Sequence, residues 1–81
     1  MNSQSHIAID LGAGSGRIML GVRQKNEIQL VEAARFNYAM QPIHGVLCWD
    51  YQELLNNLID AFHVVCSKLD ATPQSISCDS W

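Results

Sequence analysis

Hydrophobic and polar positions at the start of the chain follow the pattern of two strands joined by a turn. Residues 6–11 are apolar or β-branched enough for a buried strand, and the glycine-rich residues 12–16 interrupt that strand. From Arg17 onward, apolar side chains occupy every second position. They are Ile18, Leu20 and Val22. A period of two predicts that the chain leaves the glycines as a second strand.

The same patterning predicts a third strand and then an irregular stretch. Residues 24–27 form a polar turn, and residues 28–36 are apolar enough for the next strand. Three strands joined by short turns make a meander. Pro42 and Gly45 interrupt residues 37–49, which are expected to be irregular except for a short edge strand at residues 46–49.

The clearest element is a helix of about five turns that follows Asp50. Asp50 is a favourable N-cap and Glu53 occupies the capping-box position. Apolar residues then recur at three- and four-residue spacing, as an amphipathic helix requires. They are Tyr51, Leu54, Leu55, Leu58, Ile59, Phe62, Val65, Cys66 and Leu69. Pro73 prevents continuation of the helix, and residues 75–79 are expected to return as a strand parallel to an earlier one.

The β-β-β-α-β order of elements makes the expected fold class α/β, and the length is enough for one small domain. The chain has 81 residues, 48% of them hydrophobic, and a net charge of -3, which argues against nucleic acid or an anionic membrane as the main partner. No apolar run reaches the roughly 20 residues of a membrane helix. Three widely spaced cysteines and a short polar N-terminus favour free thiols and a cytoplasmic location.

The end of the chain suggests that the sequence is a fragment. Trp81 comes two residues after the last expected strand, and domains seldom end with an exposed aromatic residue at the edge of a sheet. We therefore expect residues 1–81 to be a partial domain whose open sheet edge is covered by the remainder of a longer chain or by a partner.

The glycine-rich turn carries the groups expected at a phosphate site. Glycines allow backbone N–H groups to approach an anion without Cβ atoms in the way. Ser15 adds a hydroxyl donor, and Arg17 adds a cation for phosphate oxygens. Asp10, at the end of the first strand, would repel bare phosphates unless Mg²⁺ or its water shell lay between them.

Two families use a turn of this kind. In methyltransferases that bind S-adenosylmethionine, a helix follows the glycines and an acidic residue ends the next strand about 20 residues on. Glu32 has that spacing from Asp10, but the alternation after Arg17 and the presence of Gly21 disfavour a helix. In sugar kinases of the actin-like ATPase superfamily, the turn joins two antiparallel strands.

Four stretches, in order and with similar gaps, make the chain resemble the start of the FGGY carbohydrate kinases. They are DLGAGSGR at residues 10–17, RFN at residues 35–37, GVLCWD at residues 45–50 and SISCDSW at residues 75–81. The sequence departs from the family pattern at Ala13, where many members have threonine, and at Gly14, where a hydroxyl residue is frequent. The resemblance implies a ribonuclease-H-like mixed sheet and an ATP-dependent kinase for a ketose such as L-rhamnulose.

The resemblance also implies roles for individual residues. The β- and γ-phosphates of ATP would be held by Ala13, Gly14, Ser15, Gly16 and Arg17. Asp10 would help to hold Mg²⁺, through water, and Trp81 would border the sugar pocket. The catalytic base of the family and its second lobe lie beyond these 81 residues, so the fragment is expected to be inactive alone. A non-catalytic remnant that no longer binds nucleotide is a third interpretation.

Overall fold

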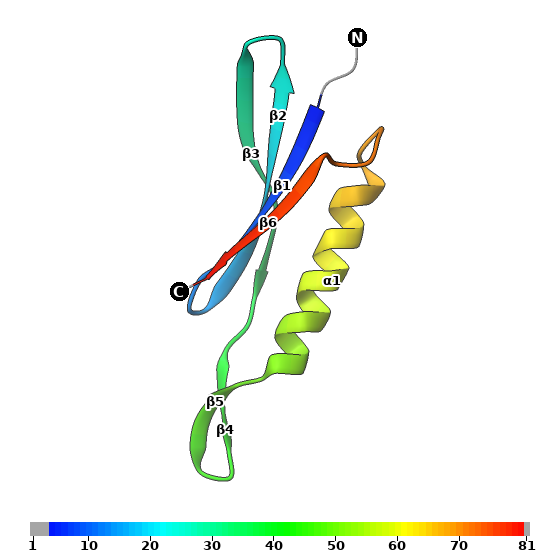
Figure 1. Ribbon diagram of the computed structural model, residues 1–81. Helices are drawn as coiled ribbons and strands as arrows, with labels where there is room; N and C mark the ends of the chain where they lie inside the picture. Colours follow the sequence, from blue (N-terminus) through cyan, green and yellow to red (C-terminus); the bar gives the residue numbers. More distant parts are fainter. Residues whose placement is uncertain (1–3, 81) are drawn as a thin grey trace.

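A four-stranded mixed sheet with one helix against it forms the body of the molecule (Figure 1). The computed structural model describes residues 4–80. The elements in chain order are β1 (Gln4–Leu11), β2 (Ser15–Gln24), β3 (Glu27–Asn37), β4 (Met40–Ile43), β5 (Val46–Trp49), α1 (Tyr51–Ser67) and β6 (Ser75–Ser80). The strand order in the main sheet is β3-β2-β1-β6.

Strands β1, β2 and β3 form the predicted antiparallel meander, and β6 lies parallel to β1. The chain after the glycine-rich turn is therefore a strand, as the alternation of Ile18, Leu20 and Val22 predicted. Helix α1 makes the crossover between β5 and β6 that a parallel return requires. Within this sheet the predicted β-β-β-α-β order is confirmed.

The stretch before the helix is more regular than the sequence predicted. Residues 40–49 form a separate two-stranded hairpin, β4–β5, so β5 is not an edge strand of the main sheet. Its turn residues His44 and Gly45 have φ of 52° and 81°, as expected for the tight turns that suit two-residue hairpin loops. Pro42 is tolerated because each strand of a two-stranded sheet has one side free of ladder hydrogen bonds.

Helix α1 begins where the sequence predicted and ends slightly earlier. The Asp50 side chain accepts a hydrogen bond from the backbone N–H of Glu53 at 3.1 Å, which caps the first turn. The helix ends at Ser67, two residues before the last apolar residue of the stripe, Leu69. The apolar stripe is only partly covered, since Tyr51 and Ile59 are exposed.

The hydrophobic core lies on one face of the sheet. Ile7, Ile9, Ile18 and Val65 form a buried cluster, and partly buried side chains of α1 and of β1, β2 and β3 pack against it. Because side chains alternate along a strand, Asp10 and Arg17 lie on the opposite face. No helix in residues 4–80 is long and apolar enough to span a membrane.

Candidate functional site

The glycine-rich turn is a tight loop of three residues between β1 and β2. The backbone N–H of Gly12 donates to the carbonyl of Ser15 at 2.8 Å, and Leu11, the last residue of β1, pairs with Gly16 of β2. The loop lies at the end of the sheet from which β4 and β5 project (Figure 1).

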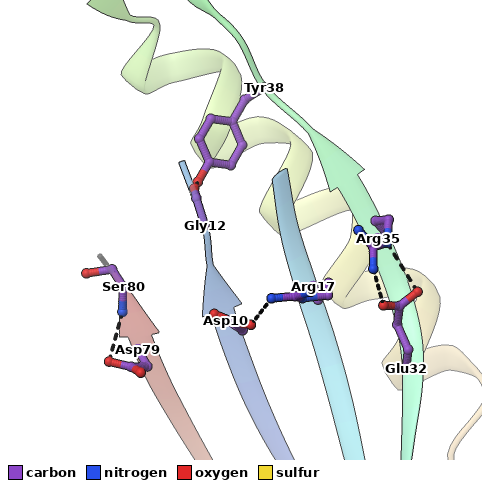
Figure 2. Close-up of polar contacts among 8 residues, drawn as sticks. All are labelled: Asp10, Gly12, Arg17, Glu32, Arg35, Tyr38, Asp79 and Ser80. Carbon is purple, nitrogen blue, oxygen red and sulfur yellow. Dashed lines mark hydrogen bonds and ion pairs between the residues drawn. The ribbon is translucent and has the colours of Figure 1, made fainter. Parts of the chain in front are cut away.

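Three successive carbonyl groups of this loop accept hydrogen bonds from residues far along the chain. The Tyr38 hydroxyl donates to the carbonyl of Gly12, toward which Figure 2 shows it pointing. Trp49 Nε1 donates to the carbonyl of Ala13 at 3.0 Å, and the Tyr38 backbone N–H donates to that of Gly14 at 3.1 Å. The carbonyl side of the turn is thus fixed by Tyr38 and Trp49.

The amide side of the turn is open. Ala13 and Gly14 are exposed, and no residue among 4–80 accepts a hydrogen bond from their backbone N–H groups. A Cβ placed on Gly14 would meet only the Tyr38 carbonyl oxygen, at 4.0 Å. Adjacent free N–H groups in a turn are suited to an anion. The described residues therefore fit a phosphate group at this position.

Gly16 has a structural role that the sequence did not reveal. It is buried opposite Phe36, and a Cβ at this position would lie 2.3 Å from the end of the Phe36 ring. Phe36 in turn packs beside Tyr38, with ring centroids 6.2 Å apart. The missing side chain of Gly16 thus makes room for the aromatic pair that supports the turn.

Burial of Tyr38, with a smaller effect of the Asp10 charge, raises the pKa of its hydroxyl.

Asp10 and Arg17 face each other across β1 and β2 and form an ion pair (Figure 2). Their side chains are 44% and 36% exposed, so a ligand from solvent can reach both. Asp79 on β6 is the register partner of Asp10 on its other side, and its carboxylate accepts the N–H of Ser80 at 3.0 Å. No group of three or more potential metal ligands occurs within residues 4–80. Asp10 therefore belongs to no such group, so any Mg²⁺ beside it would take most of its oxygen ligands from water or from a bound ligand.

Glu32 does not occupy the place that the methyltransferase interpretation requires. It lies inside β3 rather than at a strand end, and it accepts from Arg35 at 2.7 Å (Figure 2). The hydrogen bond from Arg35, with contributions from the charges of Arg35 and Arg17, lowers the pKa of Glu32. The predicted helix of that interpretation is absent as well, because β2 begins at Ser15.

Comparison with known proteins agrees with this geometry. The chain is 33% identical to a rhamnulokinase of Oceanobacillus iheyensis, with 96% of the chain matched, and 34% identical to one of Klebsiella pneumoniae strain 342, with all of it matched. A rhamnulokinase of Mannheimia succiniciproducens is 36% identical over 91% of the chain. The chain is thus similar to one segment of the rhamnulokinases, which agrees with its resemblance to the FGGY carbohydrate kinases. It spans 16–17% of the length of these relatives, no family model matches it, and nothing in these matches supports a methyltransferase.

The fold brings most of the predicted site residues together. Five of them lie in or next to the turn: Ala13, Gly14, Ser15, Gly16 and Arg17. Asp10 lies next to the turn, at the end of β1, and its carboxylate forms an ion pair with Arg17. Trp81, predicted to border a sugar pocket, lies outside the described residues.

Sequence reasoning missed the part played by Tyr38 and Trp49. The sequence patterns connected neither residue with the glycine-rich turn. Their contacts with the turn join residues 26 and 36 positions apart, a separation that local patterns do not reveal. The one available signal was the spacing of Phe36 and Tyr38 by two, which places both on one side of an extended chain.

Proposed function

We propose that this chain is the phosphate-binding, N-terminal part of an ATP-dependent sugar kinase whose acceptor is a ketose such as L-rhamnulose. The observation that carries the proposal is the pair of open amides at Ala13 and Gly14 beside the cation of Arg17. The similarity to rhamnulokinases supports the choice of phosphoryl transfer and of the acceptor. A meander followed by a parallel strand also supports the ribonuclease-H-like fold that we propose.

Each residue near the turn has a proposed part in binding. The N–H groups of Ala13 and Gly14, the hydroxyl of Ser15 and the guanidinium of Arg17 bind phosphate oxygens of ATP. Gly16 contributes by leaving room for Phe36. Asp10 takes part in holding Mg²⁺ through water, and bound Mg²⁺ supplies positive charge that offsets the charge of the phosphates.

The ion pair between Asp10 and Arg17 predicts that metal and nucleotide bind together. In the structure the charge of Arg17 is offset by the carboxylate of Asp10, so a phosphate must compete with that carboxylate for the guanidinium. A cation near Asp10 weakens the carboxylate's hold on Arg17. We therefore propose that ATP binds more tightly with Mg²⁺ than without it, and that Asp10→Asn reduces this difference.

Phosphoryl transfer itself needs groups that we do not assign to this chain. We propose that the catalytic base, which takes the proton of the sugar hydroxyl, belongs to the rest of a chain of rhamnulokinase length, as does the lobe that completes the nucleotide site. Trp81 remains a proposed neighbour of the sugar. On this proposal the 81-residue chain binds nucleotide but transfers no phosphoryl group.

Isothermal titration calorimetry of the chain with MgATP tests the proposal. Arg17→Gln should weaken binding by about tenfold or more, because a hydrogen bond to a charged group contributes about 1.5–3 kcal/mol and about 1.4 kcal/mol is a factor of ten. Arg23→Gln is the matched control, since Arg23 lies on the same strand at the end away from the turn. It should bind MgATP as the unaltered chain does.

Two results would contradict the proposal. A chain that is folded by circular dichroism yet binds no MgATP is a non-catalytic remnant. Saturable binding of S-adenosylmethionine that excludes MgATP would restore the methyltransferase interpretation.

A further inference from the structure

The carbonyl groups of the turn are held more firmly than a hairpin loop of this size requires. One hydrogen bond, from the N–H of Gly12 to the carbonyl of Ser15, already closes the loop. The three further bonds from Tyr38 and Trp49 bind the carbonyls of Gly12, Ala13 and Gly14 from outside the hairpin. Their effect must therefore be on the orientation of the peptide groups.

Peptide geometry links those carbonyls to the open amides. Because the peptide unit is planar and trans, the carbonyl of one residue and the N–H of the next point in opposite directions. Fixing the carbonyl of Gly12 therefore fixes the N–H of Ala13, and fixing the carbonyl of Ala13 fixes the N–H of Gly14. The two N–H groups without an acceptor in residues 4–80 are the two that Tyr38 and Trp49 direct outward.

Without these contacts the turn would be free to rotate. Glycine populates more backbone conformations than any other residue, and two of the three loop residues are glycines. A loop that samples several peptide orientations loses conformational entropy when an anion binds to one of them, and this loss weakens binding. Hydrogen bonds that select one orientation beforehand reduce that cost.

The two donors are themselves held in place. Tyr38 is only 3% exposed and packs beside Phe36, which fills the space over Gly16. Trp49 is half-buried at the end of β5, directly before the helix cap Asp50. The β4–β5 hairpin connects the two residues, so the phosphate turn is fixed from both ends of that hairpin.

We propose that Tyr38 and Trp49 are positioning residues that set the orientation of the Ala13 and Gly14 amides for a phosphate group. They do so through the carbonyls on the other side of the same peptide units, without touching the ligand. This inference rests on the proposed binding of nucleotide phosphates at the turn.

The first test needs no ligand. Tyr38→Phe removes the hydroxyl and keeps the ring against Phe36, and Trp49→Phe removes the indole N–H. In each variant the amide NMR signals of Ala13 and Gly14 should shift, and their hydrogen exchange should change, while signals of the distal β2–β3 turn stay constant. Tyr51→Phe, at the exposed start of α1, is the matched control and should leave the Ala13 and Gly14 signals unchanged.

The second test measures MgATP affinity by calorimetry at temperatures where every variant is folded. Tyr38→Phe and Trp49→Phe should each bind about three- to tenfold more weakly, in line with loss of one hydrogen bond. The Tyr51→Phe variant should bind as the unaltered chain does. A merely structural role for Tyr38 would lower the free energy of unfolding without moving the affinity of the folded protein.

The outcomes separate the inference from the function on which it rests. Unchanged Ala13 and Gly14 signals in Tyr38→Phe and Trp49→Phe overturn the inference whatever the ligand does. Shifted signals with unchanged MgATP affinity also overturn it, because the orientation would then not serve binding. If the unaltered chain binds no MgATP, the proposed function fails, and the ligand-free signals alone decide whether Tyr38 and Trp49 orient the turn.

Discussion

The two glycine-containing hairpin turns of this chain use glycine for different reasons. At the β4–β5 turn, Gly45 adopts a φ of 81° that other residues avoid, yet a Cβ there would meet nothing within 4 Å. At the β1–β2 turn, no glycine has positive φ among the described residues, and a Cβ on Gly16 would collide with Phe36. The β4–β5 turn thus requires glycine for its backbone conformation, and the β1–β2 turn requires glycine because a side chain would collide with Phe36.

The surroundings of the two turns differ in the same way. The carbonyls of residues 12–14 are bound by Tyr38 and Trp49, whereas the turn at His44 and Gly45 makes no hydrogen bond to another element in the described part of the chain. Hydrogen bonds from distant residues therefore distinguish the β1–β2 turn from the β4–β5 turn. Glycines alone are evidence only of a turn.

Substitution at Gly16 should have the largest effect. Gly16→Ala places a methyl group against the buried Phe36 ring, and overpacking of this kind lowers the free energy of unfolding by about 1–3 kcal/mol. Urea unfolding measures the change. Gly14→Ala, whose nearest neighbour lies at 4.0 Å, is the control and should change stability by less than about 0.5 kcal/mol. Equal losses of stability in the two variants would mean that packing does not distinguish the two glycines. If packing does distinguish them, adding Phe36→Leu to Gly16→Ala should restore part of the lost stability.

Substitution at Gly45 should have a smaller effect on stability and no effect on MgATP binding. Gly45→Ala forces a Cβ into the left-handed region and should cost about 1 kcal/mol of stability. Its MgATP affinity, measured by calorimetry, should equal that of the unaltered chain. A weaker affinity would show that the tip of β4–β5 is coupled to the glycine-rich turn, and the contrast between the two turns would no longer hold.

Alkaline pH should have the smallest effect on the free energy of unfolding, through Tyr38, which contacts the β1–β2 turn. The pKa of Tyr38 is raised above its ordinary value of 10.0 by burial and by the Asp10 charge. The unfolded chain therefore loses the proton first, so stability is complete below the ordinary pKa and falls as pH rises toward the raised one. Urea unfolding at increasing pH should show this loss in the unaltered chain and a smaller loss in Tyr38→Phe. Equal losses in both proteins would assign the pH dependence to other groups.

Local patterns were sufficient to predict the elements of the main sheet and the helix. The alternation after Arg17 and the capping pair of Asp50 and Glu53 each depend on neighbours in sequence, so the strand and the helix start were predicted correctly. The β4 strand was missed because Pro42 and the short length of the strand weaken its pattern. The hydrogen bonds of Tyr38 and Trp49 were missed because tertiary structure alone brings them to the turn.

The parallel pairing of β6 with β1 has a consequence for the order in which the chain folds. The meander joins residues that are near in sequence, whereas His6 and Ser75 meet across a separation of 69 residues. Because the entropy cost of closing a loop rises with its length, the meander closes at a lower entropic cost than the pairing of β1 with β6. A nascent chain can thus acquire the two strands that flank the glycine-rich turn before β6 is available to pair with β1.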